Sequence, residues 1–294
     1  MLRDTPAALP GQLLTGEAGA VPLVLASPHS GRDYPGEFLA RTRLTLAQLR
    51  RAEDPFVDAL LDGAVAHGVP RLAARYGRSW LDLNRAPDEL DPAMYVDPIE
   101  HHADHLSDRV TAGLGVVPRI AAQGLDIYPT RLRIADARAR IATVHTPWHA
   151  TLDELTAAAQ ARHGFAVLLD CHSMPTPPHP MGRGPQIVLG DLHGRSAAPE
   201  LVAAIEAYFT GCGLRVARNQ PYAGGYTTAR HGRPAMGIHT VQIEVDRALY
   251  MDPQRLNRHM GFAGLTAQLA GLAALLIDTA QRLPLRAPLA EAAE

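Results

Sequence analysis

The amino-acid sequence predicts an α/β fold of three layers, in which a central sheet lies between two layers of helices. Two observations favour this fold. Short apolar runs with the length of buried strands alternate with longer segments of helical pattern. Each apolar run is also followed at once by polar residues, which is typical of α/β sheets that bind ligands at the carboxyl ends of their strands. No repeat or linker divides the 294 residues, so we expect one domain over residues 1–294.

Five apolar runs are predicted to form strands. In chain order they are Leu23–Ala26, Leu72–Tyr76 with a continuation to Leu81, Val167–Leu169, Ile187–Leu189 and Val241–Ile243. The polar residues that follow them are Ser27–Ser30, Asp82–Arg85, Asp170–Ser173, Gly190–Asp191 and Glu244. Because histidines and acids concentrate at these strand ends, the sequence predicts an active site there.

Three segments have the pattern of helices. In the first, Pro55–His67, Asp54 is a suitable N-cap and Pro55 suits the first helical position. The second segment is Glu200–Phe209, and the third is the proline-free stretch Arg255–Arg282, predicted as a C-terminal helix. Helices therefore alternate with strands, as the predicted fold requires.

The overall charge and the apolar pattern exclude several kinds of partner. A formal net charge of −2 gives no basic surface for a nucleic acid. Residues 1–14 lack the pattern of a signal peptide, and the longest apolar stretch, Leu269–Ile277, is far shorter than the roughly 20 residues of a membrane helix. Two cysteines are too few for a disulfide framework. We therefore expect a soluble cytoplasmic protein.

The basic residues exclude some chemistry outright. All 28 are arginine, so catalysis through a lysine Schiff base, a lysine-bound pyridoxal cofactor and a P-loop lysine are impossible. The 14 histidines are more than structural roles normally require, which indicates metal or proton chemistry.

Two histidines stand where a metal site is expected. His29 and His172 each follow an apolar run, and Glu244 follows a third. Neutral imidazole is a good ligand for zinc, and loops at neighbouring strand ends can bring two ring nitrogens together. Either histidine alone would more often be a hydrogen-bonded loop residue.

Other motifs are weaker evidence for a functional site. His101, His102 and His105 fit a solvated or cleft-lining face better than a ligand set. Cys171 adjoins His172, but adjacent strand residues point opposite ways, so a buried apolar role is favoured over a nucleophile. The His-Glu-x-x-His and Gly-x-Ser-x-Gly motifs are absent, which excludes helix-type zinc peptidases and the usual serine hydrolases.

Asn84 and Arg85 form a candidate carboxylate-binding pair. A guanidinium group can bind a carboxylate through two parallel hydrogen bonds, and a neighbouring carboxamide can add a third. The alternative is a surface salt bridge.

Several short motifs occur together in a fixed order. They are Ser27-Pro28-His29-Ser30-Gly31, Glu53-Asp54-x-x-Val57-Asp58, Asp82-x-Asn84-Arg85, Gly113-Leu114-Gly115, Pro147-x-His149, Asp170-x-His172-Ser173, Val188-Leu189-Gly190-Asp191, Asn219-x-Pro221-Tyr222-x-Gly224-Gly225-Tyr226 and Gln242-Ile243-Glu244-x-x-Arg247-x-Leu249-Tyr250-Met251-Asp252. In this order the sequence resembles the N-formylglutamate amidohydrolases over residues 20–255. The resemblance implies a phosphorylase/hydrolase-like fold with a mixed, mostly parallel sheet, related to zinc carboxypeptidases and aspartoacylase-like deacylases.

The resemblance also implies roles for individual residues. His29 and His172 match the two histidine ligands of one Zn²⁺ ion, or of another divalent metal. Asn84 and Arg85 match the pair that holds the substrate carboxylate, and Glu244 matches the catalytic glutamate.

One departure from the related families concerns the acidic metal ligand. The relatives take it from a glutamate three residues after the first histidine, but this position is Arg32, which cannot bind a metal. The candidates for the missing ligand are Asp54, Glu53 and Asp33, in that order. N-capping would explain Asp54 about as well as metal binding.

The expected reaction is metal-dependent hydrolysis of N-formyl-L-glutamate to formate and L-glutamate, without an organic cofactor. Arg247, Arg119 and Arg131 are candidates for binding the second carboxylate. Two alternatives remain open at this stage: a deacylase of another N-acyl acidic amino acid, and a metal-free binding protein. The expected partner is this small molecule, with a homo-oligomer possible.

Overall fold

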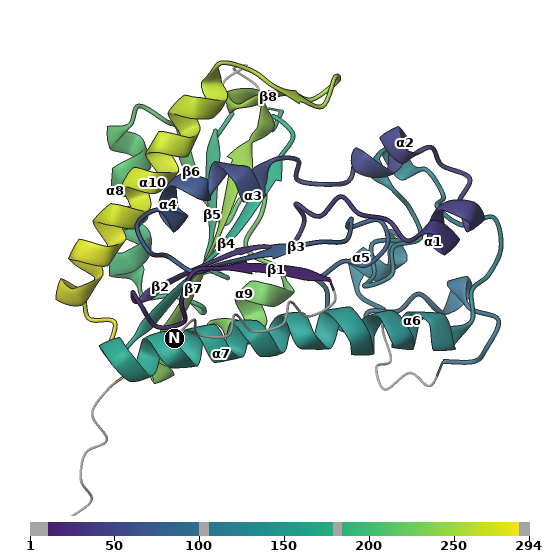
Figure 1. The fold of residues 1–294 in the computed structure, drawn as a ribbon, viewed down its shortest axis with the longest axis horizontal. Helices are drawn as coiled ribbons and strands as arrows, with labels where there is room; N and C mark the ends of the chain where they lie inside the picture. The colour runs from purple at the N-terminus through teal and green to yellow at the C-terminus, as the bar shows by residue number, and fades with distance from the viewer. Residues whose placement is uncertain (1–10, 100–105, 179–183, 288–294) are drawn as a thin grey trace, which may run out of the picture.

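The structure is a computed structural model that describes residues 11–99, 106–178 and 184–287, and a seven-stranded mixed sheet forms its centre (Figure 1). The strands are β1 (Gln12–Thr15), β2 (Leu23–Ser27), β3 (Arg71–Ala74), β4 (Ala166–Met174), β5 (Ile187–Gly190), β6 (Val216–Arg218) and β7 (Ile238–Asp246), and their order in the sheet is β1-β3-β2-β4-β7-β5-β6. Strands β8 (Met251–Asp252) and β9 (Asn257–Arg258) form a separate pair.

The sheet is mostly parallel, as predicted. Strands β3, β2, β4 and β7 run parallel to one another, whereas β1 is antiparallel to β3 and β5 is antiparallel to β7. The reversed direction of β5 corrects the prediction that Gly190–Asp191 lies with the other polar strand ends. Gly190 pairs with Gln242, and the chain then continues towards the amino end of β7. Gly190 therefore ends β5 beside the middle of β7, and the chain leaves β5 in the direction away from Glu244.

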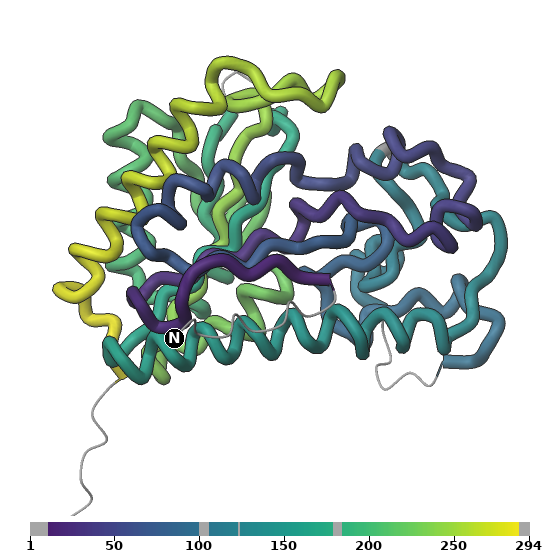
Figure 2. The backbone as a smooth tube through the Cα atoms, in the orientation of Figure 1, coloured from purple at the N-terminus to yellow at the C-terminus, as the bar shows by residue number. Residues whose placement is uncertain are grey.

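Helices cover both faces of the sheet (Figure 1). The α-helices are α1 (Gly36–Arg41), α2 (Leu46–Arg50), α3 (Val57–Leu60), α4 (Asp62–Val65), α5 (Asp108–Thr111), α6 (Ile134–Arg140), α7 (Thr146–His163), α8 (Pro199–Gly211), α9 (Tyr226–His231) and α10 (Gly261–Thr279). Short 3-10 helices are η1 (Pro92–Met94), η2 (Ala122–Gly124), η4 (Pro234–Met236), η5 (Arg247–Leu249) and η6 (Ala280–Arg282). The π-helix η3 (Ile141–His145) joins α6 to α7, so that the three form one continuous rod along the sheet (Figure 2).

The period-two pattern of the central strands divides the core into two layers. Leu23 and Leu25 of β2 pack with α3, α4, α8 and α10, whereas Val24 and Ala26 pack with α7 on the other face. In β4, Leu168 points to the α7 side, so the alternation places Asp170 and His172 on that same side. The layers predicted from the sequence are therefore present, and the site residues of β4 share the α7 face.

The strands that carry His172 and Glu244 are longer than predicted. Both β4 and β7 have nine residues, all buried, and they pair along their whole length. His172 and Glu244 therefore lie inside the strands and not after them, directly opposite each other in the register. In contrast, β3 ends at Ala74, so the predicted continuation to Leu81 is wrong and Asp82–Arg85 lies in a loop.

Two helix predictions need correction. The segment Pro55–His67 forms two short helices, α3 and α4, and the residue at the N-cap position of α3 is Phe56, with a φ of 66°. Asp54 is therefore not the N-cap. The helix predicted over Arg255–Arg282 begins only at Gly261, because Asn257–Arg258 pairs with β8.

Among the described residues, the segment Gly261–Arg282 is the one helical stretch long and apolar enough to cross a membrane by length and composition. Its side chains Leu265, Leu269, Leu272 and Leu276 are buried in the core beside β2 and α8. One face of α10 therefore packs onto the sheet. His101, His102 and His105, considered above as a polar face, lie outside the described residues.

Candidate active site

A cavity of about 460 Å³ opens where β2, β4 and β7 end. Its walls come from widely separated segments of the chain and carry many charged side chains. The charged and histidine side chains that line it are His29, Arg51, Asp54, Arg78, Arg85, Arg109, His172, Glu244 and Arg247. The preferred residues of the predicted site thus all border one cavity: His29, Asp54, Asn84, Arg85, His172, Glu244 and Arg247.

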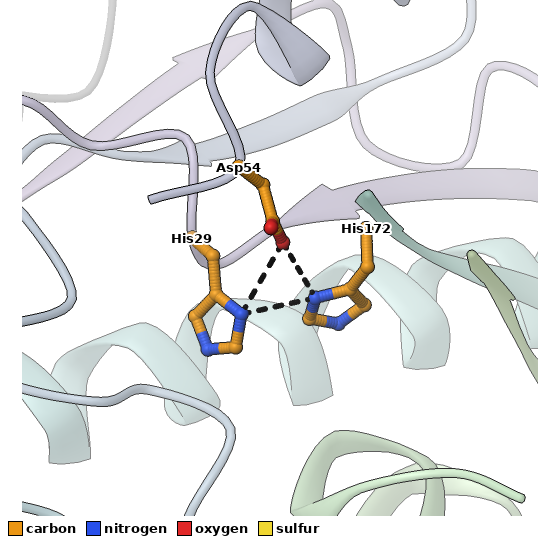
Figure 3. Close-up of side chains that lie close together, drawn as sticks. All are labelled: His29, Asp54 and His172. Atoms are coloured by element: carbon orange, nitrogen blue, oxygen red, sulfur yellow. Dashed lines mark hydrogen bonds and ion pairs between the residues drawn. The ribbon is translucent and has the colours of Figure 1, made fainter. Parts of the chain in front are cut away.

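Three side chains that line this cavity point towards one another (Figure 3). The Asp54 Oδ2 atom lies 3.1 Å from His172 Nδ1 and 3.4 Å from His29 Nδ1, and the two ring nitrogens are 3.0 Å apart. All three residues are 2% exposed. Their ligand atoms all lie within 4.8 Å of one another, so this group could hold a metal ion.

The far sides of both imidazole rings face carboxylates. His29 Nε2 lies 2.7 Å from Asp82 Oδ1, and His172 Nε2 lies 3.1 Å from Asp170 Oδ2. A carboxylate only accepts hydrogen bonds, so a proton on His29 Nε2 leaves Nδ1 of that ring free to bind a metal ion, whereas His172 Nε2 also lies 3.1 Å from the Asn84 Nδ2 donor. Carboxylates behind metal-binding histidines are typical of metal sites, where they fix the ring orientation and the tautomer.

The charges around the three side chains favour a cation between them. Burial alone would raise the pKa of Asp54, but hydrogen bonds from His172 and His29 hold it well below its usual value. Burial likewise opposes a charge on His172, yet Asp170 and Asp54 raise its pKa well above the ordinary range. An ionised carboxylate and two imidazole nitrogens form a donor set that fits a divalent metal.

The two oxygens of Asp54 have different partners. Oδ1 accepts hydrogen bonds from Ser173 Oγ at 3.2 Å and from Arg247 Nη2 at 3.0 Å, whereas Oδ2 faces the histidines. The other two candidates for the acidic ligand point elsewhere. Glu53 binds Tyr34 and Arg50, and Asp33 forms an exposed ion pair with Arg75.

Glu244 lines the same cavity and is 8% exposed. The Gln242 side chain donates a hydrogen bond of 2.9 Å to Glu244 Oε1. Burial raises the pKa of Glu244 to about 7, with a further increase from Asp54 that His172 and Arg78 counteract. A carboxyl group with this pKa can both accept and donate a proton near neutral pH.

Arg85 and Asn84 are held mainly by the backbone. Arg85 is 7% exposed, and its Nε and Nη1 atoms donate to the carbonyls of Leu114 and Asn84 at 2.9 and 2.8 Å. Asn84 Oδ1 accepts from the Thr227 amide at 2.8 Å, which turns Nδ2 to within 3.1 Å of His172 Nε2. The pair therefore joins the cavity wall to the candidate metal site.

Arg247 is tied to the site through Asp54. Its Nε atom donates to Ser173 Oγ, and its Nη2 atom donates to the Glu53 carbonyl as well as to Asp54. Arg119 and Arg131, the other arginines considered from the sequence, border a separate cavity of about 260 Å³.

Sequence reasoning missed several residues of the site. Asp82 and Asp170 each precede a predicted site residue by two positions, and that spacing could have suggested a shared face. Arg78 donates to Asp82 from Nε at 3.0 Å, and Arg109 reaches the cavity from α5 to bind the Gly224 carbonyl. No local pattern marks Arg78 or Arg109, because only the tertiary fold brings them to the cavity.

Comparison with known proteins agrees with this geometry. A family model described as N-formylglutamate amidohydrolase matches residues 21–251. A relative from Pseudomonas aeruginosa, an N-formylglutamate deformylase, is 33% identical over 257 residues, which cover 83% of this chain and 87% of the relative. An N-formylglutamate deformylase from Pseudomonas putida is 27% identical over 249 residues, covering 82% of this chain and 86% of the relative.

Two solved structures share the fold. The crystal structure of N-formylglutamate amidohydrolase from Ralstonia eutropha JMP134 has a TM-score of 0.85 and 34% sequence identity, and the match covers 92% of this chain and 99% of that one. The structure of a gene product from Agrobacterium tumefaciens has a TM-score of 0.66 at 20% identity, with 92% of this chain and 96% of that one covered. The second likeness concerns the fold alone.

Proposed function

This chain belongs to the N-formylglutamate amidohydrolase family, and from that membership we propose that it hydrolyses N-formyl-L-glutamate to formate and L-glutamate. The observation that carries the proposal is the convergence of His29, Asp54 and His172 beside Glu244 in one arginine-lined cavity. A metal site, a proton-transfer group and cationic side chains for a dianionic substrate are the components that such a reaction needs.

His29, Asp54 and His172 would hold one Zn²⁺ ion. Two imidazoles and one carboxylate are a common ligand set of catalytic zinc, which keeps a further position open for water or substrate. When bound, the ion supplies Lewis acidity, which polarises the formyl carbonyl and lowers the pKa of water. Asp82 and Asp170 orient the two histidines, and Arg247 and Ser173 orient Asp54.

Glu244 would act as the general base and then as the general acid. It takes a proton from the attacking water as the new C–O bond forms at the formyl carbon. It then gives this proton to the glutamate nitrogen as the C–N bond breaks. A pKa of about 7 leaves a substantial fraction of Glu244 ionised at neutral pH, as the first step requires.

Arginines would bind the two carboxylates of the substrate. Arg85 has an Nη2 atom without a hydrogen-bond partner among the described residues, and Asn84 lies beside it. For the second carboxylate, Arg247 retains its Nη1 atom, while the side chain of Arg51 has no ion pair or hydrogen bond within the described part of the chain. Holding the substrate at two points places the amide beside Glu244, and such positioning lowers the barrier by several kcal/mol or more.

A substrate panel tests the proposal. Purified protein supplied with zinc should release formate from N-formyl-L-glutamate faster than it deacylates N-formyl-L-aspartate, N-acetyl-L-glutamate or N-succinyl-L-glutamate. A higher kcat/KM for another member of the panel would indicate a different N-acyl amino acid. Binding of N-formyl-L-glutamate without turnover of any member would favour a binding protein that has lost catalysis.

A further inference from the structure

Three buried histidines form a second group next to the metal-binding residues. His145 ends the π-helix η3, His149 lies one turn further in α7, and His231 ends α9. Their exposed fractions are 2%, 2% and 0%. The ring centroids are 4.5 Å apart for His145 and His149, which are tilted by 53°, and 5.2 Å apart for His149 and His231, which are nearly parallel. We call this row of three rings the histidine stack. The mechanism proposed above gives these rings no role.

The stack holds two carbonyls of the site loop. His145 Nε2 lies 2.8 Å from the carbonyl oxygen of Arg85, and His149 Nε2 lies 2.9 Å from that of Leu83. Because a carbonyl oxygen only accepts, both Nε2 atoms must carry protons. His149 Nδ1 then has a lone pair, and His231 Nε2, at 2.9 Å, must donate to it. The contacts thus assign the Nε2–H tautomer to all three rings.

The held carbonyls determine the direction of Asn84. Leu83 and Arg85 flank Asn84, and their carbonyls both point to the histidine stack. The Asn84 side chain is directed to His172 Nε2, while its backbone amide donates to Asp82 Oδ1, which also contacts His29. His172 therefore contacts the Asn84 side chain directly, and His29 is linked to the Asn84 backbone through Asp82.

The surroundings of the stack favour uncharged rings. Burial lowers the pKa of His145, and it lowers that of His149 well below the ordinary value, where a charge on His145 would lower it further. Burial also lowers the pKa of His231 to about 4, although Asp153 Oδ1 lies 3.2 Å from its Nδ1. Arg230, which binds Asp153 at 2.7 Å, opposes a charge on His231. At His149 a neutral ring is also what the hydrogen bonds require, because its Nδ1 atom accepts from His231.

We propose that His145, His149 and His231 are positioning residues that set the geometry of the Leu83–Arg85 loop for binding and catalysis. His145 fixes Arg85 and so affects substrate binding. His149, supported by His231, fixes Asn84 and so affects the orientation of His172 towards the metal. The part that concerns substrate rests on the proposed function, whereas the part that concerns the metal does not.

Paired substitutions test the two roles. In His145→Leu the KM for N-formyl-L-glutamate should rise about tenfold while kcat changes less than threefold. In His149→Leu the affinity for Zn²⁺, measured by competition with a chromophoric chelator, should fall by 10-fold or more, the usual scale for a lost partner of a metal ligand. Glutamine at either position can still donate to the carbonyl, so His145→Gln and His149→Gln should recover most of the loss.

His239 provides a matched control. It is 2% exposed, donates from Nε2 to the Leu285 carbonyl at 2.8 Å and accepts from the Ala198 amide, but it does not line the cavity. His239→Leu should lower the thermal midpoint as the other leucine variants do, while KM and zinc affinity stay within twofold of wild type. If His145→Leu and His149→Leu show only what His239→Leu shows, the proposal is overturned.

NMR of the unmodified protein tests the proposal even if the leucine variants do not fold. Long-range ¹H–¹⁵N NMR of ¹⁵N-histidine-labelled protein, with resonances assigned through the glutamine variants, should show all three rings as neutral Nε2–H tautomers at pH 7. A protonated ring, or an Nδ1–H tautomer at His149, would overturn the proposal. Absence of N-formyl-L-glutamate hydrolysis in wild type would reject the proposed function only, since the zinc and NMR measurements still decide the role of the stack.

Discussion

Asp54 shows how much the function of a residue depends on the direction of its side chain. From the sequence, its position before Pro55 fitted helix capping and metal binding equally well. In the structure the helix begins after Phe56, and the Asp54 carboxylate points at His29 and His172. The two interpretations could not be separated from the sequence, because the left-handed backbone of Phe56 has no reliable sequence pattern.

Asp54→Asn should therefore remove the metal while the protein remains folded. The carboxamide is a much weaker zinc ligand than the carboxylate, and it also loses the ion pair with Arg247. We expect zinc content below a tenth of the wild-type value by elemental analysis. Asp33→Asn is the control, because Asp33 pairs with Arg75 at the surface and should keep its full zinc content. Stoichiometric zinc in Asp54→Asn would show that another residue is the ligand.

Glu244→Gln should lower kcat by roughly 100-fold or more, the usual scale for a lost general base, without loss of zinc. Glu244 is not a structural partner of Arg247, because the described contacts of the Arg247 side chain go to Ser173, Glu53 and Asp54. Asp246→Asn, two residues further along β7, is the control for general effects on the strand. If Glu244→Gln loses thermal stability but retains its turnover, the catalytic role is wrong.

At the level of elements, strands β4 and β7 explain what the sequence pattern could and could not predict. The apolar runs Val167–Leu169 and Val241–Ile243 identified both strands correctly but only their middle parts. The polar residues Asp170, His172 and Glu244 were placed after the strands because buried strands normally exclude charge. Here these side chains interact with one another beside the cavity, and the strand therefore continues through a polar stretch.

The loop before α9 packs closely against Asn84. Gly225 lies so near Asn84 that a Cβ atom would overlap the carboxamide. Gly225→Ala should displace Asn84 and lower kcat/KM at least tenfold in a steady-state assay. Gly264→Ala in α10 is the matched control, since no atom lies within 4 Å of its Cβ position and alanine favours the helix. Equal activity of the two variants would mean that Asn84 can move without consequence.

For the whole molecule, the sequence predicted the layers and the strand-end site, but it did not predict the reversed strand or the long rod beneath the sheet. Local alternation of strands and helices is enough to predict the three-layer class. The direction of β5 is set by its pairing with β7, which is a long-range contact. Helix α7 carries His149 and other polar residues towards the core, so it lacks the clear apolar face that pattern recognition needs.

The buried histidine stack should make the stability of the protein dependent on pH. In the unfolded chain His231 takes up a proton below about pH 6.5, whereas in the folded protein its pKa is about 4. The unfolded state therefore binds more protons between these values, and the free energy of unfolding decreases as the pH falls. From pH 7 to pH 5 this residue alone should contribute a loss of about 2 kcal/mol.

Urea unfolding at several pH values measures this loss. The slope of unfolding free energy against pH should be shallower in His231→Gln than in wild type between pH 7 and pH 5. Because the two proteins are compared by slope, the hydrogen bond lost in the variant does not affect the result. Parallel slopes would contradict a low pKa for His231.

The central claim is that one metal ion at His29, Asp54 and His172 makes this cavity an amidohydrolase site. Its most direct test is a titration of metal-stripped protein with Zn²⁺, in which formate release from N-formyl-L-glutamate is followed against bound zinc. We expect no release without metal and a linear rise that ends at one zinc per chain. Full activity of the metal-stripped protein, or a saturated site without formate release, would contradict the account.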